Sequence, residues 1–126
     1  MTVIISKLPN EQVVLSTLSL PLHLAPGEIQ NLNREIARIA ATTPGPLFHI
    51  CKIHEVEPLS FSDILLWLAE QKDYLPGSIH DYRVITILIG NGRMYELWWK
   101  KIHQRVGISI LLFSSVAEAL AYVRTA

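Results

Sequence analysis

The sequence has little cysteine, no excess of either charge and no long apolar segment. Of its 126 residues only Cys51 is a cysteine, so no internal disulfide is available. Eleven Lys and Arg residues balance eleven Asp and Glu residues. A balanced chain has no field of one sign that would attract nucleic acid or an anionic membrane surface. We therefore expect neither nucleic acid nor a membrane among its partners.

Two further absences concern location. The longest uninterrupted apolar stretch covers residues 64–69, far below the roughly 20 residues that cross a bilayer. The opening MTVIISK lacks the basic and apolar regions of a secretory signal, so we expect a cytoplasmic protein. What the chain does have is 50% hydrophobic and 17% charged residues, which is typical of one compact core. We expect residues 1–126 to form a single domain.

Hydrophobic periodicity predicts alternating strands and helices. Residues 3–6 and 12–20 are β-branched and leucine-rich segments joined by a Pro-Asn turn, which indicates an opening hairpin. Further strands are predicted at residues 47–54, 83–89 and 108–113, and helical stripes follow at residues 26–39, 61–68, 93–105 and 116–123. This order predicts an α/β fold: about five strands in a mostly parallel sheet, an N-terminal hairpin and about four helices.

The second half of the chain resembles a known family. The stretch RVITILIGNG at residues 83–92 leads into an amphipathic helix, and ISILLFSSVAEAL at residues 108–120 reads as a last strand followed by a helix. Together with the order of elements, these segments resemble the STAS or SpoIIAA-like group, which includes anti-sigma-factor antagonists and related small regulatory or ligand-binding proteins. The resemblance implies a STAS/SpoIIAA-like domain and a non-enzymatic regulatory or protein-interaction role.

The same resemblance implies a role for two serines in the stretch LSFSD at residues 59–63. In anti-sigma-factor antagonists, the helix after the central strand begins with a serine that the partner kinase phosphorylates, within an Asp-Ser type of motif. Ser60 occupies the corresponding place and Ser62 lies beside it, so the resemblance implies a phospho-acceptor or docking loop here. The sequence departs from the motif, because Leu59 stands in place of the Asp and the glycine is absent.

A capping role is the structural alternative for the same loop. As an N-cap, Ser60 would accept a hydrogen bond from the N–H of Asp63, and the Asp63 side chain would reach back toward the helix start. Ser115 and Glu118 show the related capping-box spacing before the last helix, where capping explains both residues. The cap and the phosphoswitch therefore remain two open interpretations of Ser60.

Catalytic and metal motifs are not evident in the sequence. His49 and Cys51 alternate onto one face of a predicted strand, but two ligands are too few for a closed zinc site. A buried cysteine commonly behaves as a small hydrophobe. The GNG stretch at residues 90–92 lacks the lysine of a phosphate-binding loop and predicts a tight turn. We expect no enzyme, no metal and no cofactor.

The predicted helix at residues 93–105 carries more aromatic surface than one sheet face covers. Tyr95, Trp98 and Trp99 lie on two apolar stripes of this helix. Partial burial within the domain is one explanation, since Trp is seldom fully buried; a protein interface or the wall of a ligand pocket is the other.

The first functional hypothesis is therefore a regulatory module that docks a protein partner, with a homodimer left open. The alternative is a binding protein for a small apolar ligand.

Overall fold

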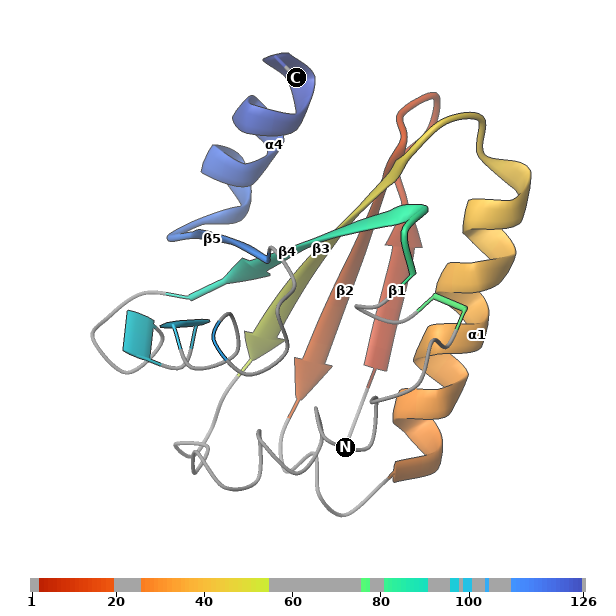
Figure 1. The fold of residues 1–126 in the computed structure, drawn as a ribbon, viewed down its shortest axis with the longest axis horizontal. Helices are drawn as coiled ribbons and strands as arrows, with labels where there is room; N and C mark the ends of the chain where they lie inside the picture. Colours follow the sequence, from red (N-terminus) through yellow and green to blue (C-terminus); the bar gives the residue numbers. More distant parts are fainter. Residues whose placement is uncertain are drawn as a thin grey trace.

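The computed structural model describes residues 3–19, 26–54, 76–77, 81–90, 96–97, 99–100, 104 and 110–125. Within these residues the chain forms an α/β structure with one five-stranded sheet in the order β1-β2-β3-β4-β5 (Figure 1). The elements, in chain order, are β1 (Val3–Lys7), β2 (Val13–Ser19), α1 (Pro26–Thr42), β3 (Leu47–His54), β4 (Val84–Ile89), β5 (Leu111–Phe113) and α4 (Val116–Thr125).

The sheet is mixed, because β1 runs antiparallel to β2 whereas β2, β3, β4 and β5 are parallel to one another. The hairpin between β1 and β2 turns through Asn10, whose φ of 59° lies in the left-handed region that Asn tolerates better than most residues. The Leu8 N–H closes this turn by donating to the Val13 carbonyl at 3.0 Å. The α/β class, the five strands and the N-terminal hairpin predicted from the sequence are confirmed.

The predicted number of helices is confirmed only in part. The described residues contain two full helices, α1 and α4, rather than about four. The helix predicted at residues 61–68 lies outside the described residues, and the one predicted at residues 93–105 is described only at positions 96–97, 99–100 and 104, which are helical. β5 begins at Leu111, later than the predicted residue 108, and the carbonyl of the preceding Ile110 accepts a hydrogen bond from the Trp99 indole.

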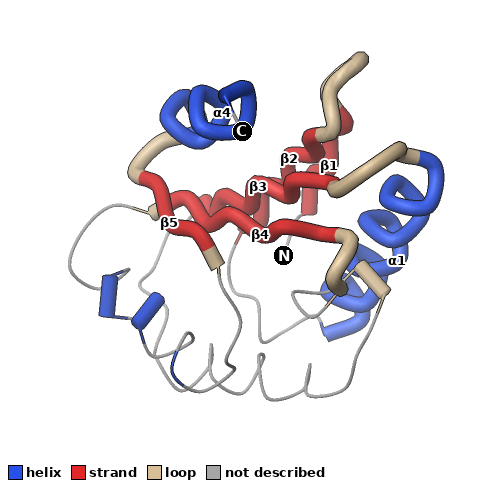
Figure 2. The backbone as a smooth tube through the Cα atoms, turned by 45° about the horizontal axis from the view of Figure 1, so that its top comes forward, coloured by secondary structure: helices blue, strands red, loops and turns tan. Residues whose placement is uncertain are grey.

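The two helices lie on opposite faces of the sheet (Figure 2). α4 packs on the face formed by alternate residues of β2 to β5, where the buried core comprises Val13, Ile50, Ile87, Ile89 and Ala119. α1 packs beside β1 on the other face and buries the apolar stripe predicted from its sequence, Leu32, Ile36 and Ile39. Side chains that alternate along each strand therefore enter two separate layers.

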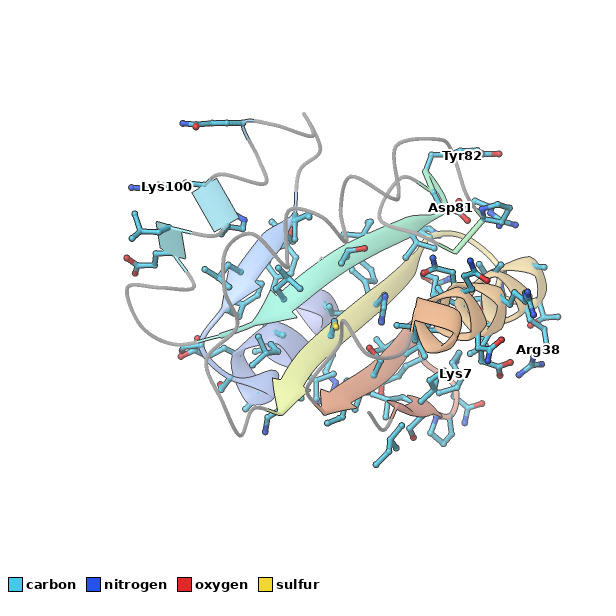
Figure 3. The ribbon with its side chains drawn as sticks, turned by 90° about the horizontal axis from the view of Figure 1, so that it is seen from below. Lys7, Arg38, Asp81, Tyr82 and Lys100 are labelled. Carbon is cyan, nitrogen blue, oxygen red and sulfur yellow. The ribbon has the colours of Figure 1, made fainter. Side chains whose placement is uncertain are left out.

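The start of β4 is fixed to α1 through Gly77 and Asp81. The buried Asp81 carboxylate accepts hydrogen bonds from the Gly77 N–H at 2.7 Å and the Arg83 N–H at 2.9 Å, and it pairs with the Arg83 guanidinium at 2.8 Å. Burial by itself raises the pKa of Asp81, but the hydrogen bonds from Arg83 and Gly77 outweigh it and lower the pKa to about 2. Asp81 lies beside α1, whereas its neighbour Tyr82 is 85% exposed (Figure 3).

Substitution of Gly77 is expected to destabilise the fold strongly. At φ 80°, a Cβ at this position would lie 1.9 Å from the Asn33 carbonyl oxygen of α1. We expect Gly77→Ala to lower the free energy of unfolding by roughly 3 kcal/mol, the sum of left-handed strain and backbone overlap. Gly45→Ala is the matched control: its φ is 76°, but its nearest contact is the Gln12 side chain at 3.1 Å, so the expected cost is about 1 kcal/mol. Equal losses in urea unfolding would contradict the Gly77 contact with α1.

Candidate functional site on the covered sheet face

Four buried polar side chains lie on the sheet face opposite α4, and we call them the polar row: Ser16, His49, Cys51 and Thr86. β2 supplies Ser16, β3 supplies His49 and Cys51, and β4 supplies Thr86. Parallel pairing sets Ser16 beside Cys51 and His49 beside Thr86. None of the four is more than 6% exposed, which is unusual for Ser, Thr and His.

Ser16 connects two other members of the polar row, His49 and Cys51. Its Oγ lies 2.6 Å from His49 Nε2, a hydrogen bond whose donor depends on the imidazole tautomer. If Nε2 accepts the serine proton, Nδ1 carries the ring proton; if Nε2 donates, Nδ1 is left as an acceptor. Ser16 also forms a hydrogen bond with the Cys51 side chain. The imidazole can therefore present either a donor or an acceptor without gaining a charge.

Burial keeps the titratable members of the polar row neutral near pH 7. It lowers the pKa of His49 to about 4, because the charged imidazolium would lose its hydration. It raises the pKa of the Cys51 thiol to about 11, although the hydrogen bond with Ser16 acts in the opposite direction. An imidazole with this pKa is a weak general base, and a thiol with this pKa is a weak nucleophile.

Thr86 is the member of the polar row whose side-chain hydrogen bonding is incomplete. Its Oγ1 is buried and has no hydrogen-bond partner among the described residues. A hydroxyl carries one donor and two acceptor sites, and leaving it unpaired in an apolar environment costs about 1–3 kcal/mol. On the same strand face, Val84 and Leu88 flank it, and both are buried. This hydroxyl therefore needs a partner that these neighbours do not supply.

Metal binding has little support at the polar row. Across the described residues, no group of three or more His, Cys, Asp or Glu side chains gathers closely enough to hold a metal ion. His49 and Cys51 do share one strand face, as the sequence indicates, but Ser16 holds both in hydrogen bonds. The groups present are those of a neutral hydrogen-bonding site.

A hollow in the surface lies between the hairpin and the end of α1. This hollow of about 520 Å³ is lined in part by Lys7, Gln12 and Arg38, of which Lys7 and Arg38 are labelled in Figure 3. Three of its polar side chains already have partners: Lys7 Nζ donates to the Leu8 carbonyl at 2.8 Å, Gln12 donates to the Pro44 carbonyl, and Arg38 pairs with Glu35. We therefore prefer the polar row as the candidate site.

Most of the site residues predicted from the sequence fall outside the described part of the chain. This applies to Ser60, Ser62, Tyr95 and Trp98, so the cap, the phospho-acceptor loop and most of the aromatic surface stay predictions. Trp99 is described: it is half-buried, and its indole N–H donates to the Ile110 carbonyl. One of the three predicted aromatic residues is therefore hydrogen-bonded to the residue that precedes β5.

Sequence reasoning missed Ser16 and Thr86. Each is a single polar side chain on an apolar strand face. The apolar neighbours predict a buried strand in each case and do not single out the polar residue. The signal that would have found them is register: once β2, β3 and β4 are aligned, Ser16, His49, Cys51 and Thr86 fall on adjacent positions of one face. A single strand shows only an isolated polar residue.

No family model matches the chain, and no curated protein or solved structure matches it. The STAS/SpoIIAA-like resemblance accordingly stays a prediction. Within the part of the chain that the structure describes, no helix has the length and apolar character needed to cross a membrane.

The buried state of His49 predicts a specific dependence of stability on pH. Because its pKa is about 4 in the folded protein and 6.5 in the unfolded reference, the unfolded chain binds more protons between these values. Stability is thus fully present above about pH 6.5 and falls as the pH decreases toward 4. We expect His49 to account for a loss of about 2 kcal/mol between pH 7 and pH 5.

Urea unfolding at pH 7 and pH 5 measures this effect, with His49→Gln as the control that retains a polar side chain and cannot titrate. The control should show a smaller decrease in unfolding free energy over the same interval. Identical decreases in the two proteins would mean that His49 is not held neutral by burial.

Proposed function

We propose that the protein is a non-enzymatic binding module that holds a small, largely apolar ligand against the polar row. The observation that carries this proposal is the buried Thr86 Oγ1, which lacks a hydrogen-bond partner among the described residues. Buried polar groups in folded proteins are almost always paired, and an exception calls for an explanation such as a bound molecule. A ligand oxygen or nitrogen would satisfy this hydroxyl.

The surroundings of the polar row support a ligand with an apolar body. On the same face of β3 and β4, Leu47 pairs with Val84 and Cys51 pairs with Leu88, and all four side chains are buried. Small-molecule sites typically combine such an apolar lining with a few convergent polar groups. The polar row has this composition.

Binding fits the chemistry of the polar row better than catalysis. Ser16 and His49 are close enough to resemble a nucleophile and its base, but burial lowers the His49 pKa to about 4. A base this weak has little tendency to accept the serine proton at neutral pH. Burial accounts for this lowered pKa, whereas a carboxylate that orients His49, as in a catalytic triad, would raise the pKa.

A protein-docking role is the second proposal, and it is the one that the family resemblance favours. Leu97 is 45% exposed in the helical positions 96–97, two residues before the anchored Trp99. An exposed apolar side chain in this helical segment suits a contact surface. We extend this proposal to a cytoplasmic STAS/SpoIIAA-like domain, supported by the hairpin at the start of the sheet and by β5 followed by α4 at its end.

Native mass spectrometry of protein purified under non-denaturing conditions from its native source tests the first proposal. We expect a small molecule that stays bound in the native spectrum and is lost on denaturation. Thr86→Val should raise the dissociation constant about fivefold and so lower the bound fraction by up to that factor, because the ligand loses a hydrogen bond worth about 1 kcal/mol. Thr86→Ser keeps the hydroxyl and is the control.

The outcomes of this measurement separate the two proposals. A small molecule retained equally by wild type, Thr86→Val and Thr86→Ser would contradict a site at the polar row. A co-purified protein without any small molecule would favour the docking proposal instead.

A further inference from the structure

We infer that the polar row selects an uncharged ligand, one that presents a carbonyl or similar acceptor oxygen to Thr86 and an apolar body to the neighbouring strands. This inference rests on the proposed binding function and adds the chemical class of the ligand. It depends on which groups of the polar row are already paired and on the absence of charged side chains among the described residues of this sheet face.

The acceptor requirement follows from the pairing within the polar row. Ser16 bonds with His49 and with Cys51, so the hydrogen-bonding capacity of these three residues is partly used before any ligand arrives. Among the described residues, Thr86 has no such partner and keeps its hydroxyl proton available. A carbonyl oxygen accepts this proton directly. His49, which pairs with Thr86 in the β3–β4 register, can adjust its tautomer to a second ligand group.

The exclusion of charge follows from the residues of this face. Along β2, β3 and β4 its described side chains are Val14, Ser16, Leu47, His49, Cys51, Val84, Thr86 and Leu88, none of which is acidic or permanently cationic. Burial also keeps His49 and Cys51 neutral at pH 7. An ion placed here would lose its hydration without gaining a counter-charge, which is costly.

Charged groups at the start of β4 and on β1 already have partners. Asp81 and Arg83 pair with each other at 2.8 Å at the start of β4. Lys7, on the edge strand β1, donates its ammonium protons to the Leu8 and Glu11 carbonyls of the hairpin. Drawing either cation toward a ligand anion would break these contacts, so a carboxylate gains little from them.

The apolar body follows from the positions beside Thr86. Val84 and Leu88 flank it on β4, while Leu47 and Cys51 lie opposite these two residues on β3. A ligand that reaches the Thr86 hydroxyl must therefore lie against hydrocarbon and a neutral thiol. Removal of apolar ligand surface from water then contributes to affinity, and the single acceptor fixes orientation.

Three probes with the same six-carbon chain test this inference: 2-hexanone, hexanoate and hexylammonium. Each is titrated into the full chain at pH 7 and followed by amide chemical shifts of β3 and β4. We expect 2-hexanone to bind at least tenfold more tightly than either ion. Thr86→Val should weaken 2-hexanone about fivefold to tenfold, whereas Thr86→Ser should retain most of the affinity.

The results distinguish failure of the inference from failure of the proposed function. If hexanoate or hexylammonium binds more tightly than 2-hexanone and this binding is lost in Thr86→Val, the uncharged ligand class would be overturned. The proposed binding site at the polar row would still be supported. Binding of 2-hexanone that Thr86→Val does not change would overturn the assignment of Thr86 as the contact. If the amide shifts of β3 and β4 do not respond to any of the three probes, both this inference and the proposed ligand binding at the polar row would be overturned.

Discussion

A hydroxyl on the covered face of a central strand must find a hydrogen-bond partner or lower the stability of the fold, and Thr86 is the described residue that meets this constraint without a partner. Valine would fill nearly the same volume on β4 and suits a strand equally well, since both residues are β-branched. Packing and β-propensity therefore do not explain a threonine here. A partner outside the described residues does, and a ligand is the partner that we propose.

The rest of the described fold keeps this hydroxyl and its neighbours buried on one face of the sheet. Parallel pairing of β2, β3 and β4 aligns Ser16, His49, Cys51 and Thr86 on one face, and α4 occupies the opposite face (Figure 2). Gly77 and Asp81 anchor the start of β4 to α1, so the position of Thr86 is tied to the helix as well as to the sheet. Burial then removes the charge of His49.

Local patterns predicted the elements well, because period-two and helical periodicities act within one segment. β3 spans Leu47–His54 as predicted, and Ser115 Oγ accepts from the Glu118 N–H at 3.1 Å, which confirms the capping interaction. Contacts between distant segments were missed: Gly77 against α1, and the polar row, depend on strand register and helix docking. Two neutral polar residues, Ser16 and Thr86, also carry no motif that marks them within apolar strands.

The most direct test of the constraint at Thr86 is the unfolding free energy of ligand-free protein with Thr86→Val. If the hydroxyl is buried without a partner, valine removes an unsatisfied group, and stability should rise by about 1 kcal/mol or more. Circular dichroism in urea, with Thr86→Ser as the variant that keeps the hydroxyl, measures the difference. A decrease of about 1 kcal/mol in the unfolding free energy of Thr86→Val would show that the hydroxyl already makes a stabilising hydrogen bond. This result would contradict a ligand site in which the Thr86 hydroxyl lacks a partner until the ligand binds.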